Sequence, residues 1–344
     1  MSNSAQTVAD IGESGVLRLI APFLSPASLR LLVPPGDDCA VAAVRGNLQV
    51  LTTDLLVEGN HFLSGPATDW LLLGRKAVAV NLSDIAAMGA LPDSILVSVG
   101  LPPHLTAASL EMIYRGMSFE AGLADTLLTG GDTVRANQFV INLAVVGHKS
   151  TDDGTCLRSN CRPGHNVYVS GFLGGSRAGL DMVLGKSCSR SECDALELDS
   201  FRLRHLTPEP RIALGRMLAT EFPDSAVIDV SDGLHNELGL LCRASGTAIK
   251  VTMNDIPLFP ALEKYCGDQR AAAEFALFSG EEYELLFTTA ATEEQITSAL
   301  LRLDIPTAVT KIGTVEQGDK LLIVDGRGEP VPFTDVTYRH FNPS

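Results

Sequence analysis

The hydrophobic pattern divides the chain into stretches with helical spacing and short apolar runs that are typical of strands. Apolar residues recur every three or four positions at 14–24 and 107–123, and a nearly continuous apolar run covers 70–88. These spacings predict three helices in the first half of the chain. Short apolar runs predict strands before and between these helices. The predicted strands cover 39–44, 48–54, 93–102, 126–129 and 139–146.

A polar stretch with Gly and Pro, residues 147–166, interrupts this pattern. Such a break predicts a domain boundary, which we place between residues 149 and 150. Strands are predicted again beyond it, at 166–171, 225–230 and 283–289. Helices are predicted at 174–184, 211–222, 233–245 and 292–303. Strands and helices mix without steady alternation, so the pattern favours two α+β domains, 1–149 and 150–344, over a doubly wound parallel sheet.

Composition narrows the classes of partner. The chain has 344 residues, 45% of them hydrophobic, which is enough for two cores. Its 41 acidic and 26 basic residues give a net charge of −15. This charge argues against a nucleic-acid backbone or an anionic membrane surface as the partner. It fits a protein that holds cations, although many proteins are simply acidic.

Targeting signals and cysteine usage favour the cytoplasm. The first residues, "MSNSAQTVADIGESG", lack the basic start and apolar run of a signal peptide, and no apolar stretch approaches transmembrane length. Seven cysteines, an odd number, indicate reduced thiols rather than a disulfide framework. Cys156 with Cys161 and Cys188 with Cys193 have a spacing that could hold zinc, but their flanks favour free thiols.

A carboxylate stands in an apolar context at Asp84. The segment "NLSDIAAMGA", residues 81–90, follows the long apolar run and continues in small apolar residues. An unpaired charge there costs on the order of several kcal/mol. Counted by helical turns, Asn81 and Asp84 lie one turn apart on the same face as Ala77 and Met88.

Other aspartates share this context of apolar runs that end at small residues. The acids are Asp37, Asp38, Asp54, Asp84, Asp132, Asp229 and Asp232. Hydroxyl oxygens lie beside them at Thr52, Thr53 and Ser231. Hard oxygen ligands without a Cys or His set are what Mg²⁺ selects, and Mg²⁺ commonly bridges carboxylates to phosphates. Each motif alone is explained as a turn or a helix cap, but their repetition indicates phosphoryl transfer or nucleotide binding.

A resemblance to a known family rests on motifs that occur in a fixed order. They are "GDDCA", "TTDLLVEGNHF", "KAVAVNLSDIAAMGA", "GGDT", "DVSDGL" and "SGEEYELLF". With these motifs the chain resembles thiamine-monophosphate kinases over nearly its whole length, from Gly12 to Phe341. The resemblance implies the α+β fold of the aminoimidazole ribonucleotide synthetase-like superfamily. It also implies a homodimer whose N-terminal sheets pair, and a C-terminal α/β sandwich domain.

The resemblance further implies an activity and a set of site residues. The activity is transfer of the γ-phosphate of ATP to thiamine monophosphate, with the N-terminal domain binding ATP and Mg²⁺ and the C-terminal domain completing the substrate site. The expected Mg²⁺ ligands are Asp38, Thr52, Thr53, Asp54, Asp84, Asp132, Asp229 and Asp232. The expected ATP contacts are Gly131, Asp132, Arg158 and Ser231. The expected contacts to thiamine monophosphate are His61, Glu281 and Tyr338.

The implied chemistry agrees with the residues. Several Mg²⁺ ions would neutralise two phosphate-bearing substrates in an acidic site. The acceptor is already an anionic phosphate, so we expect neither a strong protein base nor a phosphoenzyme nucleophile. Two positions depart from the family pattern. His165 stands where an acid is common, which weakens the ATP role of Arg158, and Glu282 stands where Asp is usual, one methylene longer.

Other functions remain as alternatives. A nucleotide-binding regulator of the same superfamily that has lost catalysis would share the fold, although the intact set of acids argues against it. A related ATP-dependent synthetase is the other alternative. Selenophosphate synthetase needs a reactive Cys or selenocysteine and a Lys near the N-terminus, and this chain has no Cys before Cys39 and no Lys before Lys76. The hydrogenase-maturation relative ends in a Cys tail, whereas this chain ends "RHFNPS".

Overall fold

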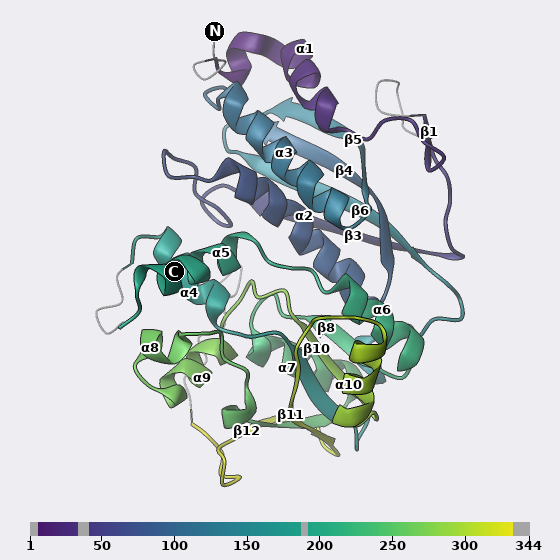
Figure 1. Ribbon diagram of the computed structural model, residues 1–344, viewed down its shortest axis with the longest axis vertical. Helices are drawn as coiled ribbons and strands as arrows, with labels where there is room; N and C mark the ends of the chain where they lie inside the picture. Colours follow the sequence, from purple (N-terminus) through teal and green to yellow (C-terminus); the bar gives the residue numbers. More distant parts are fainter. Residues whose placement is uncertain (1–5, 34–40, 187–191, 333–344) are drawn as a thin grey trace. The chain divides into compact units, whose positions relative to one another are not determined.

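The chain forms two compact units (Figure 1). The structure is a computed structural model that describes residues 6–33, 41–186 and 192–332. Unit 1 consists of Met1–Ile85 with Ala90–Thr151, and unit 2 consists of Ala86–Gly89 with Asp152–Ser344. Among the described residues, every helix is too short or too polar to span a lipid bilayer.

Unit 1 is built on a four-stranded sheet with the order β3-β6-β4-β5. β4 and β5 are parallel, and the other neighbours in this sheet are antiparallel. A separate pair of short strands is formed by β1 and β2. In chain order the elements are α1 (Val8–Ile20), η2 (Ala21–Phe23), β1 (Leu31–Val33), β2 (Val41–Ala42), β3 (Leu48–Val57), α2 (Trp70–Ala87), β4 (Leu91–Leu101), α3 (Ala107–Leu123), β5 (Leu127–Arg135) and β6 (Val140–Lys149).

The two faces of this sheet differ in cover. α2 and α3 lie side by side along one face (Figure 1), and Ile141, Leu143 and Val145 of β6 are buried there. Because successive strand residues point to opposite faces, the other face carries Leu51, Leu55 and their neighbours. Leu51 is 69% exposed and Leu55 is 50% exposed. Unit 1 therefore has one apolar sheet face that none of its own described helices covers.

Unit 2 contains a six-stranded sheet with the order β12-β9-β11-β7-β10-β8. All neighbours are antiparallel except β12 and β9. The elements are η3 (Arg158–Asn160), β7 (Asn166–Ser170), α4 (Gly175–Val183), α5 (Ala195–Leu206), α6 (Ile212–Glu221), β8 (Ala226–Asp229), α7 (Leu234–Ser245), β9 (Ala248–Thr252), η4 (Met253–Asp255), α8 (Leu262–Cys266), α9 (Gln269–Leu277), β10 (Leu285–Thr289), α10 (Glu293–Arg302), β11 (Val309–Glu316) and β12 (Leu321–Val324).

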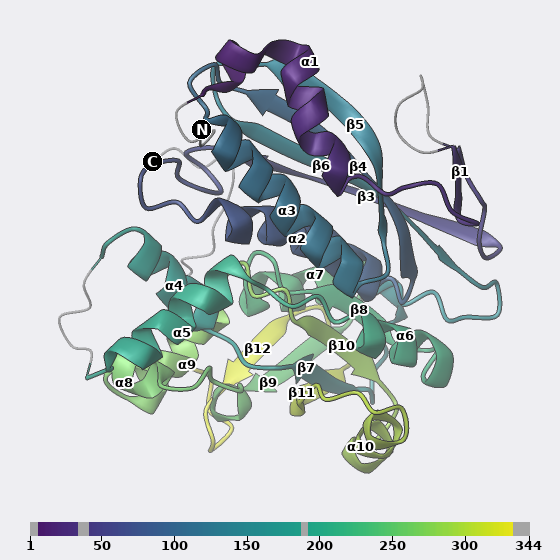
Figure 2. The ribbon, with the colours of Figure 1, turned by 45° about the horizontal axis from the view of Figure 1, so that its top comes forward.

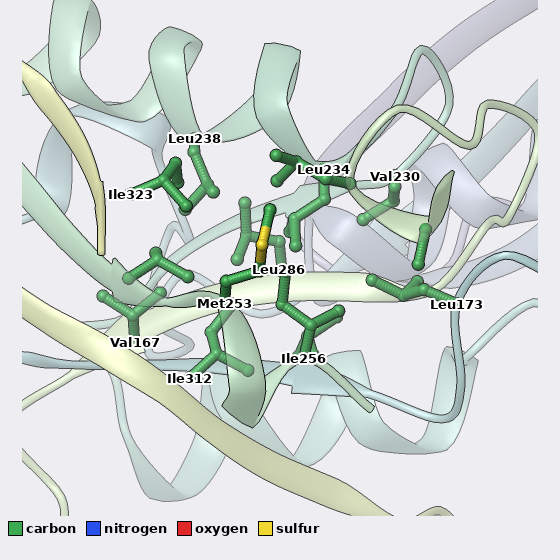
Figure 3. Packing of buried hydrophobic residues seen from close by; sticks show 14 of the residues in the cluster. Val167, Leu173, Val230, Leu234, Leu238, Met253, Ile256, Leu286, Ile312 and Ile323 are labelled. Carbon is green, nitrogen blue, oxygen red and sulfur yellow. The ribbon is translucent and has the colours of Figure 1, made fainter. Parts of the chain in front are cut away.

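Each face of the second sheet has its own core. On one face, Leu234 and Leu238 of α7 pack toward Leu286 of β10 (Figure 3). The helices α4, α5, α8 and α9 gather together in the same unit (Figure 2). On the other face, Tyr168 stacks on Phe287 with ring centroids 5.2 Å apart, in a cluster with residues of α6 and α10. This arrangement is the α/β sandwich expected for the C-terminal half.

The two cores also separate the first cysteine pair. Cys156 belongs to the cluster of α6 and α10, whereas Cys161 belongs to the cluster of α7. Thr247 Oγ1 donates to Cys161 Sγ at 3.4 Å. The two thiols therefore lie in different cores, and Cys188 of the second pair lies outside the described residues.

The predicted helix at 14–24 was wrong at both ends. α1 begins at Val8 because Thr7 and Asp10 form a capping box, in which each side chain accepts the backbone N–H of the other. The segment kinks at Gly12, whose φ is +64°. α5, α8, α9, β9, β11 and β12 were not predicted. α8, β9 and β12 span only four or five residues, and polar residues split the apolar positions of α5 and β11.

Candidate active site

In unit 1 the carboxylates of Asp54 and Asp84 meet between strand β3 and helix α2. Asp84 lies in the last turn of α2, and Thr52 Oγ1 of β3 donates to Asp84 Oδ2 at 2.5 Å. One turn earlier, Asn81 Oδ1 accepts the Asp54 N–H at 2.9 Å, and Asn81 Nδ2 donates to the Ala77 carbonyl at 3.0 Å. The predicted helix face with Asn81 and Asp84 is thus the face that contacts β3.

The charge on Asp84 acts on Asp54. Burial, and secondly the negative charge of Asp84, together raise the pKa of Asp54 to about 6. Two carboxylates that repel each other at neutral pH favour a cation between them. The repulsion makes it unfavourable for both carboxylates to be ionised when no cation is bound. Such a pair indicates a cation-binding site.

Thr53 and Asp132 lie on the opposite side of the sheet. Thr53 Oγ1 donates to Asn142 Oδ1 of β6 at 3.0 Å, whereas Thr52, one residue earlier, contacts α2. Asp132 of β5 pairs with Ser98 of β4, and Ser98 pairs with Asn142. The expected ligands of unit 1 are therefore divided between the helix-covered face and the exposed face.

Gly131 allows the backbones of β4 and β5 to approach closely. Its φ is +151°, and the register of β4 and β5 shifts just before it. A Cβ built on Gly131 would lie 1.7 Å from the Val97 carbonyl oxygen. Only glycine fits this position. The bulge therefore lies directly beside Asp132, in the middle of β5.

In unit 2 the predicted residues gather where β8 ends and α7 begins. Asp229 is the last residue of β8 and is 5% exposed. Glu237 of α7 holds the following loop, because its Oε1 accepts the Asp232 N–H at 2.8 Å and the Ser231 hydroxyl at 3.4 Å. Glu237 Oε2 accepts from Asn236 Nδ2 at 2.7 Å. Burial is the main cause that raises the pKa of Glu237.

Glu281 joins this group through a neighbouring turn. Its N–H donates to the Ser231 carbonyl at 2.6 Å. Its Oε2 lies 3.7 Å from His205 Nδ1 of α5, and its side chain is 27% exposed. The structure thus brings together Asp229, Ser231, Asp232 and Glu281, which the sequence had placed on two separate motifs.

Beside this turn lies a buried network of charges that the sequence analysis missed. Glu284, 1% exposed, accepts from Arg211 Nε and Nη2, both at 2.7 Å, and from Arg204 Nη2 at 2.9 Å. Burial acts to raise the pKa of Glu284, but the hydrogen bonds from Arg211 and the charges of both arginines hold it below its ordinary value. Only the run of glutamates in "SGEEYELLF" signalled this network.

Arg158 and His165 lie away from the Asp229 end of unit 2. The Arg158 carbonyl accepts from Ser245 Oγ, at the C-terminal end of α7, whereas Ser231 precedes its N-terminal end. Twelve residues of helix separate these ends by about 18 Å. His165 contacts Asp224 and Thr288, at the opposite end of the strands from Asp229.

His61 lies four residues beyond the end of strand β3 and caps it. Its Nδ1 accepts the Val57 N–H at 3.0 Å, so the ring fixes the turn that follows the strand. Asp38 and Tyr338 lie outside the described residues.

The oxygen donors of these two groups fit a hard divalent cation. Within the described ranges, no three His, Cys, Asp or Glu side chains form a ready metal site. The donors that do converge in unit 1 are two carboxylates and one hydroxyl, all oxygen ligands of the kind that Mg²⁺ prefers. The closeness of Asp54 to Asp84 supports a cation there, because a bound cation would offset the repulsion between the two carboxylates.

Comparison with known proteins agrees with the resemblance given above. Residues 36–148 match the family described as AIR synthase related protein, N-terminal domain. Thiamine-monophosphate kinase of Bacillus subtilis is 37% identical over 295 residues, which cover 84% of this chain and 87% of that protein.

Solved structures agree in fold. The crystal structure of thiamine-monophosphate kinase from Stenotrophomonas maltophilia superposes with a TM-score of 0.78 at 31% identity, covering 92% of this chain and 97% of the other. A structure described as AaThiL complexed with AMPPCP and TMP gives a TM-score of 0.73 at 32% identity, covering 96% and 98%. The chain belongs to the thiamine-monophosphate kinase family, with the fold of the aminoimidazole ribonucleotide synthetase-like superfamily.

Proposed function

We propose that this protein transfers the γ-phosphate of ATP to thiamine monophosphate and so forms thiamine diphosphate, the last step in making that coenzyme. The observation that carries the proposal is the pair of mutually repelling carboxylates, Asp54 and Asp84, in a chain whose relatives bear the name of this activity. The relative that was solved with AMPPCP, an ATP analogue, and TMP is similar over 96% of this chain.

Several Mg²⁺ ions would be held by oxygen ligands, because the predicted ligands of unit 1 lie on both faces of its sheet. The proposed ligands are Asp38, Thr52, Thr53, Asp54, Asp84, Asp132, Asp229 and Asp232. Bound to them, Mg²⁺ would neutralise the phosphates and stabilise the charge on the transferred group.

The protein's own residues orient these ligands. The Thr52 hydroxyl donates to Asp84 Oδ2 and so fixes the orientation of that carboxylate. Asn81 accepts the Asp54 N–H and thereby fixes the main chain of β3 against α2. Positioning of this kind favours transfer because little rearrangement is needed when the substrates bind. The acceptor oxygen already carries negative charge, so we assign no protein base and no nucleophile.

The remaining predicted residues are proposed to contact the two substrates. We propose that Gly131, Asp132, Arg158 and Ser231 contact ATP, with Arg158 and Ser231, about 18 Å apart along α7, at different parts of the nucleotide. The proposed contacts to thiamine monophosphate are His61, Glu281 and Tyr338. In this assignment the N-terminal domain, 1–149, binds ATP and Mg²⁺, and the C-terminal domain, 150–344, completes the substrate site. The odd number of cysteines supports a cytoplasmic enzyme.

We also propose that the enzyme is a homodimer. The support is the exposed face of the unit 1 sheet, where Leu51, Leu55 and Leu96 are 69%, 50% and 45% exposed. A second copy of this face would cover it symmetrically.

A turnover assay tests the function. Purified protein is incubated with ATP, MgCl₂ and thiamine monophosphate, and thiamine diphosphate is separated by chromatography. We expect one thiamine diphosphate for each ADP formed, and no ADP without the acceptor. ADP without thiamine diphosphate would indicate a different acceptor, and nucleotide binding with neither product would indicate the inactive regulator.

A further inference from the structure

The turn that presents Glu281 has a backbone that its residues do not favour. Glu281 has φ of +57° and Tyr283 has φ of +51°, and neither is a glycine. L-residues with side chains rarely adopt this left-handed region, because Cβ approaches the following carbonyl oxygen. Two such residues on both sides of Glu282 persist only if other contacts hold the turn in place.

Glu282, between them, supplies those contacts. Its side chain is completely buried, and its Oε1 accepts the Gly174 N–H at 2.7 Å, the Ser176 N–H at 3.2 Å and the Ser279 hydroxyl at 2.6 Å. Arg204 Nη2 donates to the carbonyl oxygen of Glu282 at 2.5 Å, and Arg204 Nε lies 3.4 Å from Oε2. The main chain and the side chain of this one residue are therefore both fixed.

Stability alone does not explain this arrangement. Oε2 of Glu282 is buried and accepts no hydrogen bond from the described residues. A completely buried carboxylate, whose Oε2 has an ion pair with Arg204 but no hydrogen bond, commonly stabilises a fold less than an apolar side chain of the same shape. The residue maintains the shape of the turn at a cost in stability, as positioning residues at functional sites do.

A second buried glutamate fixes the adjacent loop independently. Glu237 accepts from the Asp232 N–H, the Ser231 hydroxyl and Asn236 Nδ2. The turn of Glu282 and the loop of Glu237 meet through the N–H of Glu281, which donates to the Ser231 carbonyl. Two clamps of the same chemical kind thus hold two neighbouring segments.

We propose that Glu282 is a positioning residue for the acceptor substrate, because it fixes the turn that presents Glu281, whereas Glu237 positions the nucleotide-binding loop at Ser231. The inference rests on the proposed function for the identity of the two substrates. The turn geometry and the two clamps stand on the structure alone.

The same substitution tests both clamps. Glu282→Gln and Glu237→Gln each keep the size of the side chain and replace one acceptor oxygen by an NH₂ group. Every group that contacts these carboxylates is a donor, so the new NH₂ faces donors in both variants. Each substitution therefore loosens its own segment by the same chemistry.

The readout is the Michaelis constant for each substrate. We expect Glu282→Gln to raise KM for thiamine monophosphate about tenfold, with KM for ATP changed less than about twofold. Glu237→Gln should show the reverse. Glu282→Asp keeps the charge on a shorter side chain and should restore KM for thiamine monophosphate in part. Equal changes in both constants for both variants, or a folded Glu282→Gln enzyme with unchanged KM, would overturn the assignment.

Hydrogen exchange gives a test that does not need turnover. Mass spectrometry of the parent and the variants compares exchange at the amides of residues 281–283 and 231–233. Faster exchange at 281–283 in Glu282→Gln, with 231–233 unchanged, supports the clamp, and unchanged exchange at 281–283 contradicts it. If Glu282→Gln does not fold, the same comparison is made with Glu282→Asp. A parent without kinase activity would refute the proposed function. The exchange at 281–283 would still show whether Glu282 holds the turn.

Discussion

At the scale of single residues, the negative charge of Asp84 lowers the stability of the protein without ligands, and a bound cation would offset this effect. Asp84 faces Asp54 across the contact of α2 with β3, and the two charges repel. Asp84→Asn keeps the size of the side chain, and its amide oxygen can still accept from the Thr52 hydroxyl. We expect thiamine diphosphate formation to fall about 100-fold or more, because a charge near the transferred phosphate is lost.

The same variant should be as stable as the parent, or more stable, without ligands, because the repulsion is gone. The rise of Tm on adding Mg²⁺ and ATP should shrink, since only the remaining affinity stabilises the fold. Thermal melts with and without Mg²⁺–ATP measure both effects. Asp319→Asn, an exposed loop position, serves as the control. Normal turnover in Asp84→Asn would show that this residue is structural.

His61 combines a structural contact with a proposed substrate contact. Because its Nδ1 accepts the Val57 N–H, His61→Ala removes a cap as well as the ring, whereas His61→Asn places an oxygen near the Nδ1 position. We expect both variants to raise KM for thiamine monophosphate far more than KM for ATP. Only His61→Ala should also lose about 1 kcal/mol of unfolding free energy.

Tyr338→Ala should show the same split, with KM for thiamine monophosphate raised far more than KM for ATP. Equal effects on both constants would place these residues elsewhere.

We expect His165 to affect stability rather than the site. Burial lowers its pKa, with Asp224 acting in the opposite direction and Arg162 in the same direction. The unfolded chain therefore binds the proton more readily, so the stability present above pH 6.5 is lost as pH falls through that value. His165→Gln should flatten the decline of Tm between pH 7 and pH 5 and leave both Michaelis constants unchanged. A changed KM for ATP would instead indicate that His165 influences nucleotide binding.

The residues of the site differ in how far the sequence could predict them. The helical spacing of Asn81 and Asp84 was enough to place both on one face, which the structure confirms. The sequence could not assign Thr52 and Thr53 to opposite faces, because that depends on which side α2 covers. Glu237 and Glu282 were missed because their role is visible only when distant N–H groups, such as that of Gly174, converge on them.

At the scale of elements, the glycine-rich bulge of β5 sets the position of Asp132. A side chain at Gly131 would collide with the Val97 carbonyl of β4, so the two strands would have to separate. We expect Gly131→Ala to lower the unfolding free energy by about 2–4 kcal/mol and to abolish turnover. In Gly122→Ala on α3, the new methyl meets no atom within 4 Å, and it should be neutral or stabilise by up to about 1 kcal/mol. Chemical denaturation compares the two. A Gly131→Ala protein as stable as the parent would contradict the close approach.

Elements were predictable where a long apolar pattern dominated. The helix predicted at 107–123 is α3, Ala107–Leu123, and the run at 70–88 corresponds to α2. Boundaries that depend on caps or kinks, such as the start of α1 at Val8, were missed. The order of the strands was not predictable, because pairings such as β7 between β10 and β11 join segments more than a hundred residues apart.

At the scale of the whole molecule, one substitution separates the proposed dimer from an active monomer. Leu51 is 69% exposed on the uncovered face of the unit 1 sheet. In a symmetric dimer Leu51→Glu would introduce its charge twice into one apolar interface. We expect sedimentation to give a two-chain mass for the parent and a one-chain mass for the variant. Thiamine diphosphate formation should fall at least about tenfold, because Asp132, a proposed ATP contact, lies on the same face of the sheet as Leu51. Leu301→Glu on α10, also exposed at 78%, should keep the dimer and the activity. A parent that sediments as one chain at assay concentration while fully active would refute the dimer. A monomeric, fully active Leu51→Glu protein would show instead that each copy holds a complete site.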